Sequence, residues 1–204
     1  EDLKKGLTRE SREFRDKLPR NGVEGALKSR PASFYIPENA KRIKTGNLDD
    51  DLSLLKDVDW IIEVVVERLD IKKSVFGKLE SVMTPGTIIS SNTSGISAKA
   101  ICEGRSENFR KHFAVTHFFN PPRYMKLLEI VPGPDTLPGV VEALAEVCEK
   151  VIGKGIVYAK DTPNFVANRV GIFSTVYAIN AMDKYGLTVE EVDAASGRAL
   201  ARSV

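Results

Sequence analysis

The sequence predicts an α/β protein in which a doubly wound sheet is followed by the start of an all-helical domain. Short apolar runs rich in β-branched residues alternate with amphipathic helical stretches, a pattern typical of β-α-β units. Three of these runs carry polar or ionisable residues near their ends, where an open α/β sheet exposes its rim. From residue 161 onward, apolar residues recur at helical spacing. We therefore expect a sheet domain over residues 1–160 and a helical segment over residues 161–204.

Composition and charge are those of an ordinary globular chain. Its 204 residues, 42% hydrophobic and 28% charged, suffice for one domain and part of another. A net charge of +2 is too small to indicate a nucleic acid or a membrane surface as partner. No apolar run approaches the ~20 residues of a membrane span. The two cysteines lack metal-site or C-x-x-C spacing, so we expect no metal and a cytoplasmic location.

The first 34 residues are highly charged and predict an N-terminal helical hairpin. Leucines recur on one stripe of the first helix, and Asn21-Gly22 separates it from a second helix in VEGALKSR. The hairpin would cover one end of the sheet. From Ala40 we expect a short strand in KRIKTGNL and a short helix over Asp49–Lys56, with acidic residues in its first turn.

WIIEVVVE, from Trp60 to Glu67, is the most strand-like segment and predicts a strand buried on both faces. Glu67 ends this run, where a carboxylate could meet a ribose or substrate hydroxyl. Glu63 interrupts the run, either as a site residue or as a satisfied buried acid. The following stretch, LDIKKSVFGKLESVM, predicts a helix that packs back on the sheet and stops at Thr84-Pro85-Gly86.

Four further strands are expected. TIISSNTS is a buried run that breaks into small polar residues, after which Ser97 caps a short helix that Gly104 closes. HFAVTHFF and KLLEIV follow, and GIVYAK is the last. Between the last two, a helix begins near Pro138, and its inward face is expected to comprise Val140, Val141, Leu144, Val147, Cys148 and Val151.

His117 and Glu129 are the candidate acid–base pair, twelve residues apart on two of these strands. Histidine can accept and donate a proton near neutral pH, and a carboxylate against its other ring nitrogen would fix the tautomer. Taken singly, a histidine at a strand end is more often a structural residue, and a glutamate in a short strand is often an edge residue.

At Asp161-Thr162-Pro163 the pattern changes to helix. Thr162 can cap a helix and Pro163 can start one. Thr188 and Glu191 have the spacing of a capping box that opens a further helix.

The segments SNTS, HFFNP and DTPNFVANR together resemble the 3-hydroxyacyl-CoA dehydrogenases of fatty-acid β-oxidation, over nearly the whole chain from about Gly46. The similarity is closest to bacterial members fused to an enoyl-CoA hydratase domain. It implies an NAD-dependent enzyme that oxidises an (S)-3-hydroxyacyl-CoA to the 3-ketoacyl-CoA. A homodimer through the helical domain is also implied.

The resemblance assigns roles to eight residues and suggests that the N-terminal hairpin helps to bind coenzyme A. For Lys72 a plain solvated lysine is the alternative, and Asn164 stands where many relatives have glycine. In the hairpin, Lys4, Lys5 and Arg9 could meet the coenzyme A phosphates. The implied catalytic residues are His117, Glu129, Ser94 and Asn168, and the implied cofactor-binding residues are Glu67, Lys72, Asn92 and Asn120.

A G-x-G-x-x-G turn, which binds the dinucleotide pyrophosphate in such sheets, is missing from the sequence. We therefore expect a truncated Rossmann-like sheet, cut from a longer protein, that by itself binds NAD weakly and is inactive. Two other functions remain open: a dehydrogenase for a β-hydroxy acid without coenzyme A, and a catalytically inert α/β domain.

Overall fold

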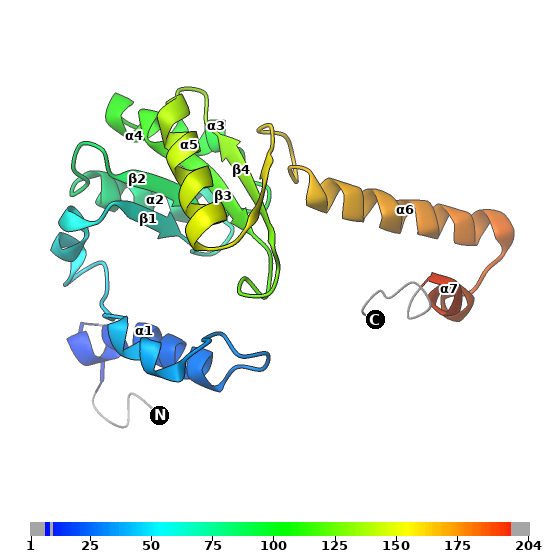
Figure 1. The fold of residues 1–204 in the computed structure, drawn as a ribbon, viewed down its shortest axis with the longest axis horizontal. Helices are drawn as coiled ribbons and strands as arrows, with labels where there is room; N and C mark the ends of the chain where they lie inside the picture. Colours follow the sequence, from blue (N-terminus) through cyan, green and yellow to red (C-terminus); the bar gives the residue numbers. More distant parts are fainter. Residues whose placement is uncertain (1–6, 9, 197–204) are drawn as a thin grey trace.

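The computed structural model describes residues 7–8 and 10–196, whose strands form one five-stranded sheet in the order β1-β2-β3-β4-β5 (Figure 1). β1, β2 and β3 are parallel, β4 runs antiparallel to β3, and β5 is parallel to β4. The expected α/β sheet is thus confirmed. The strands are β1 (Trp60–Glu63), β2 (Ile88–Ser91), β3 (Phe113–Phe118), β4 (Leu127–Pro132) and β5 (Gly155–Tyr158).

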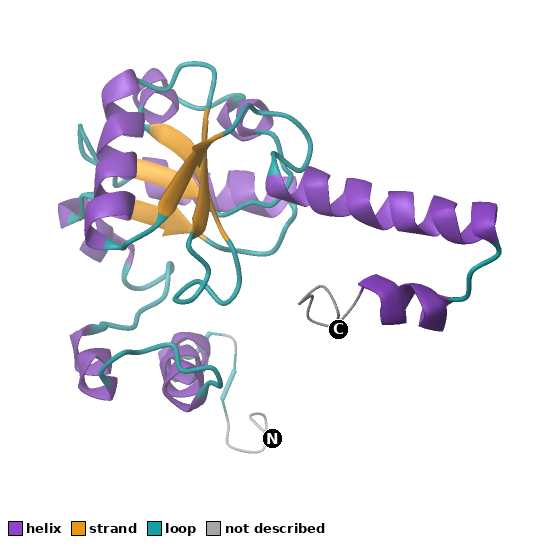
Figure 2. Cartoon of the chain, turned by 45° about the vertical axis from the view of Figure 1, so that its right-hand side comes forward, coloured by secondary structure: helices purple, strands orange, loops and turns teal. Residues whose placement is uncertain are grey.

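Helices cover both faces of the sheet, with the strands between them in Figure 2. On one face lie α2 (Leu69–Glu80), α3 (Ala98–Cys102) and α4 (Glu107–Lys111), and on the other lies α5 (Pro138–Glu146). The first core centres on the rings of Phe76, Phe109 and Phe113, whose centroids lie 5.3–5.6 Å apart. Alternate residues of a strand face opposite sides, so β3 contributes to both cores.

The expected local caps of the short helices are present. The Ser97 hydroxyl accepts the amide of Ala100 at the start of α3, as predicted. Gly104, at φ +77, closes the turn after α3 in the left-handed region that glycine adopts without steric cost. A second serine cap, Ser106, opens α4 in the same way.

Helix α3 has an additional cap that the sequence did not reveal. The carboxylate of Asp161, after β5, accepts hydrogen bonds from the Ser97 hydroxyl at 2.7 Å and from the amides of Ala98 and Lys99, both at 2.9 Å. A carboxylate at the start of a helix accepts hydrogen bonds from amides that have no acceptor within the helix, and its negative charge interacts favourably with the helix dipole. Asp161 thereby ties the segment that leaves the sheet to the loop that follows β2.

The helical hairpin at the N-terminus was wrongly predicted, because α1 (Arg12–Lys28) is a single helix that runs through Asn21-Gly22. A helix interior tolerates glycine at a cost of about 1 kcal/mol, which does not break the hydrogen-bond ladder. The 3₁₀ helix η2 (Pro37–Arg42) packs against α1, and both lie outside the sheet layers (Figure 1). Lys4, Lys5 and Arg9 lie outside the described residues.

Two expectations about the first strands are corrected. Residues 43–47 form no strand, and the short helix after them is the 3₁₀ helix η3 (Leu52–Asp57). β1 ends at Glu63, and Val64 and Val66 beyond it are 67% and 59% exposed. Among the described strands β1 pairs only with β2, so it is an edge strand. A central strand needs a hydrogen-bonded neighbour on each side. β1 has β2 on one side, and the described chain provides no strand on the other.

The prediction of the inward face of the helix after β4 was partly wrong. Val140, Leu144 and Cys148 are buried, but Val147 and Val151 are 41% and 79% exposed. The reason is the π-helical turn η4 (Val147–Val151), whose wider winding rotates the later residues away from the core.

Beyond β5 the chain forms α6 (Ala167–Tyr185) and α7 (Val189–Ser196), and α6 extends away from the sheet (Figure 1). The capping box of α7 is confirmed, since Thr188 and Glu191 exchange hydrogen bonds of 2.8 and 3.2 Å. The expected start of α6 at Pro163 was wrong by four residues. No described helix is both long and apolar enough to span a membrane. The division at residue 160 stays a prediction.

Asp161→Ala should lower the free energy of unfolding by about 1–3 kcal/mol, because it leaves two helix amides and a hydroxyl without their acceptor. Urea denaturation followed by circular dichroism measures the loss. Asp135→Ala is the matched control, because in the described part of the chain Asp135 pairs with Arg110 alone, at the surface. A loss of unfolding free energy no greater than that of the control would mean that the Asp161 cap does not stabilise the fold.

Candidate active site

The register of β3 against β4 places His117 directly opposite Glu129. Because the two strands are antiparallel, the side chains meet as a cross-strand pair and not as neighbours at two parallel strand ends. His117 Nδ1 lies 2.7 Å from Glu129 Oε2, and the residues are 4% and 0% exposed. The imidazole also contacts the rings of Phe119 and Phe165, with centroids 4.4 and 5.7 Å away.

The second oxygen of Glu129 caps α6. Oε1 accepts the amides of Val166 at 2.9 Å and of Ala167 at 2.8 Å, the first helical residue. Both carboxylate oxygens are therefore occupied, as suits a buried charge. One side chain orients the histidine and fixes the beginning of the helix that carries Asn168.

The backbone that enters α6 is strained. Asn164 and Phe165 have φ values of 61° and 47°, in the left-handed region where residues other than glycine are uncommon. Asparagine tolerates this conformation better than most residues other than glycine. Asn164 Oδ1 also lies 3.1 Å from where a Cβ on Gly95 would be, so the loop after β2 and the entry to α6 are closely packed. Strained backbone of this kind is typical of functional sites.

A second charged group lies at the ends of β1 and β2. Lys72, on the first turn of α2, is 1% exposed, and its ammonium lies 2.9 Å from Glu63 Oε1 and 3.3 Å from Glu67 Oε2. The alternative of a solvated Lys72 was therefore wrong. Glu67 Oε1 accepts the hydroxyl of Thr93 and, at 2.9 Å, the amide of Ser94. Burial alone would raise the pKa of Glu67, but these hydrogen bonds and Lys72 together lower it.

The other four expected residues lie in the loops after β2 and β3 and on α6. Asn168 Nδ2 lies 3.5 Å from the carbonyl oxygen of Ser94. This contact joins α6 to the loop after β2. Asn92 Oδ1 accepts the amide of Phe118 at 2.8 Å and so links the ends of β2 and β3. Asn120 is exposed in the loop after β3. Their roles in binding stay predictions.

Sequence reasoning missed or left open three contributors to this site. Thr93 binds Glu67, Phe165 contacts His117, and Glu63 holds Lys72. For Glu63 a signal existed, since an ionisable residue inside an apolar strand needs a buried partner. No local signal marks Phe165, which reaches the histidine from a different part of the chain.

The residues fit the nicotinamide side of a dinucleotide, as judged by the acceptors present. The Glu67 side chain is 45% exposed, and its Oε2 receives only the Lys72 ammonium, so it retains acceptor capacity for a ribose hydroxyl. No group of three or more metal-ligating residues occurs in the part of the chain that the structure describes. The pyrophosphate-binding glycine turn is not in the sequence.

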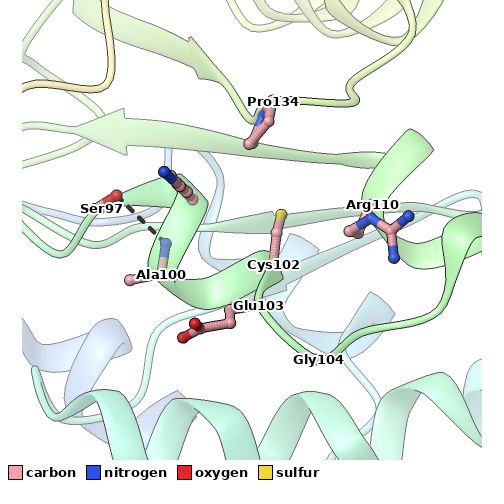
Figure 3. Close-up of a pocket in the computed structure, with 8 residues that line it drawn as sticks. Ser97, Ala100, Cys102, Glu103, Gly104, Arg110 and Pro134 are labelled. Carbon is pink, nitrogen blue, oxygen red and sulfur yellow. Dashed lines mark hydrogen bonds between the residues drawn. The ribbon is translucent and has the colours of Figure 1, made fainter.

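A separate hollow of about 480 Å³ lies beside α3 and includes Cys102 and Arg110 in its lining (Figure 3). Figure 3 shows the Cys102 sulfur between Pro134 and Arg110. Burial, with the charge of Asp135 nearby, raises the pKa of the Cys102 thiol to about 12. The thiol is thus no nucleophile near neutral pH, and the hollow contains none of the expected catalytic residues.

A mostly parallel sheet with a buried histidine–glutamate pair and a ribose-type carboxylate at the strand ends is typical of nucleotide-dependent α/β dehydrogenases. The model of the family "3-hydroxyacyl-CoA dehydrogenase, NAD binding domain" matches residues 6–162. The chain belongs to this NAD-binding family.

Relatives agree with this assignment. Proteins of Bacillus subtilis and Deinococcus radiodurans, each named "Probable 3-hydroxyacyl-CoA dehydrogenase", are 48% identical over 99% of the chain and 50% identical over 93%. The crystal structure of FadB2 from M. tuberculosis superimposes with a TM-score of 0.75 at 28% identity, covering 90% of this chain and 63% of that one. The chain spans 26% of the Bacillus relative and 55% of the Deinococcus relative.

Both cysteines should react slowly with a thiol reagent in the native state at pH 8. A thiol with a pKa of about 12 is ionised about one part in ten thousand there, against about one in four for an ordinary thiol. Burial raises the pKa of Cys148 as well. We expect Ellman's reagent to react roughly 10³-fold faster with Cys102 after unfolding in guanidinium, and faster with Cys148 as well. Rapid alkylation of native Cys102, located by peptide mass spectrometry, would contradict this.

Proposed function

We propose that the protein containing this chain oxidises an (S)-3-hydroxyacyl-CoA to the 3-ketoacyl-CoA with NAD. The observation that carries the proposal is the contact of 2.7 Å between His117 Nδ1 and Glu129 Oε2, buried beside the polar ends of β2. A secondary alcohol must lose a proton as its carbon loses hydride, so the reaction needs a base of this kind.

His117 acts as the base through Nε2. The ionised Glu129 carboxylate only accepts hydrogen bonds, so Nδ1 carries the ring proton and Nε2 holds the lone pair. No described residue forms a hydrogen bond with Nε2. When Nε2 takes the hydroxyl proton, Glu129 stabilises the imidazolium that forms. In the reverse direction Nε2 returns the proton.

NAD, when bound, accepts the hydride from the substrate carbon. Glu67 would hold the nicotinamide-side ribose through Oε2, and we keep Lys72, Asn92 and Asn120 as neighbours of the cofactor. Ser94 and Asn168 would hydrogen-bond the substrate oxygen. Their approach at 3.5 Å across α6 supports a site formed by both the sheet domain and the helical segment from residue 161.

An acyl-CoA substrate, a fused enoyl-CoA hydratase domain and a homodimer through the helical segment complete the proposal. The length of the Bacillus relative, of which this chain spans 26%, is compatible with further domains. The exposed apolar side chains of α6, such as Phe173 and Tyr177 at 70% and 67%, suit a further contact surface. Two free cysteines agree with a reducing cytoplasm.

His117→Gln in the full-length protein should reduce kcat by at least about 10²-fold and change KM far less, because it removes proton transfer in the transition state. Steady-state oxidation of 3-hydroxybutyryl-CoA measures this. His112→Gln is the matched control, since the His112 imidazole binds the Asn108 carbonyl at the end of α4 and, within the described residues, has no other hydrogen bond. Activity of His117→Gln within threefold of the parent would remove His117 from the mechanism.

Glu129→Gln should lower kcat by about 10²–10⁴-fold without unfolding the protein. The amide oxygen can still accept the Val166 and Ala167 amides, but the amide NH₂ then faces His117 Nδ1. The imidazole must place its proton on Nε2, which can no longer act as a base. The tautomer is read from ¹⁵N chemical shifts of the imidazole, and stability from thermal unfolding. An unchanged tautomer with reduced activity would refute this explanation.

A further inference from the structure

Lys72 is a buried cation in an unfavourable place. It lies on the first turn of α2, where the helix dipole disfavours positive charge, and its side chain is 1% exposed. A buried ammonium is stable only when opposite charge and hydrogen bonds compensate for lost hydration. Glu63 provides this compensation, with Oε1 and Oε2 at 2.9 and 3.1 Å from the ammonium.

Glu63 has no capacity left for a ligand. Besides the ammonium, its carboxylate accepts the Ser91 hydroxyl and the Val65 amide, both at 2.6 Å, and its side chain is 0% exposed. Any influence of Glu63 on a bound molecule must therefore pass through a neighbour. Lys72 is that neighbour, because its ammonium also contacts Glu67 Oε2 at 3.3 Å.

Glu67 is the one member of the group that reaches solvent. Its Oε1 is occupied by Thr93 and Ser94, whereas Oε2 receives only the longer contact from Lys72. Two carboxylates share one ammonium, so the group carries one net negative charge, which lies on the exposed Glu67. Without Glu63, the ammonium would have Glu67 as its only counter-charge and would draw Oε2 inward.

We propose that Glu63 is a positioning residue of the nucleotide site: it anchors Lys72, so that Glu67 Oε2 stays charged and free to accept ribose hydroxyls. This inference rests on the proposed function in one respect, the contact of Glu67 with the nicotinamide-side ribose. Lys72, with its donors directed at Glu63, Glu67 and the Val65 carbonyl, is then also a positioning residue.

The test measures the NADH dissociation constant of the full-length protein by calorimetry. Glu63→Gln should raise it about tenfold or more, because the stranded ammonium occupies Glu67. Lys73→Met, on the same helix but paired with Glu103 at the surface, should leave it unchanged. A constant for folded Glu63→Gln within threefold of the parent would overturn the proposal.

The double variant Glu63→Gln/Lys72→Met separates positioning from stability, because a buried ion pair replaced by neutral residues is often tolerated. In the double variant no ammonium is left to occupy Glu67, so, if the stranded ammonium is what weakens binding in Glu63→Gln, the double variant binds NADH within about threefold of the parent. A folded double variant that binds NADH as weakly as Glu63→Gln would overturn the proposal. Should Glu63→Gln fail to fold, Glu63→Asp takes its place, because its shorter side chain draws the carboxylate away from the ammonium, and the same rise in the NADH dissociation constant is expected.

Glu67→Gln distinguishes the two levels of the inference. Weaker NADH binding in Glu67→Gln, with normal binding in Glu63→Gln, would contradict the positioning role of Glu63. The proposed contact of Glu67 with the ribose would remain. Unchanged NADH binding in Glu67→Gln would overturn both. Lys72 acetylation by acetic anhydride, followed by mass spectrometry, adds a readout independent of NADH: we expect protection in the parent and labelling in Glu63→Gln.

Discussion

The site depends on one buried carboxylate that makes contacts in two directions. Glu129 Oε2 meets the imidazole of His117, and Oε1 accepts the first amides of α6. A buried carboxylate without partners would be costly, so burial obliges both oxygens to be occupied. The same requirement therefore orients the histidine and fixes the start of the helix that carries Asn168.

The group formed by Glu63, Lys72 and Glu67 follows the same physical rule with a different result. Glu63 and Lys72 are hidden, and only Glu67 is half exposed at the strand ends. Burial would raise the pKa of Glu67, but the hydrogen bonds from Thr93 and Ser94 and the Lys72 ammonium keep it low. The sheet thus presents a proton acceptor at His117, held by the buried Glu129, and an anionic hydrogen-bond acceptor at Glu67, held by the buried Lys72 and Thr93 and by the Ser94 amide.

Elements with strong local signals were predicted well. Ser97 and the Thr188–Glu191 box cap their helices through residues three positions away, so the sequence alone carries the information. The predictions failed where the secondary structure depends on contacts with distant parts of the chain. WIIEVVVE reads as a central strand, yet it lies at the edge of the described sheet, and residues 43–47 form no ladder. At Asn21-Gly22, the residue types of a turn lie inside a helix.

By itself the sequence determined the α/β class, most strands and helices, and the residue types at the site, because periodicity and capping act over a few residues. The tertiary structure decided which of these residues meet. The antiparallel register of β3 and β4 places His117 against Glu129, and Glu129 caps α6 from 37 residues away, where Thr162 and Pro163 had suggested a local start. Lys72 could equally have been a surface lysine. Only the fold, by burying it against Glu63, required a buried counter-charge.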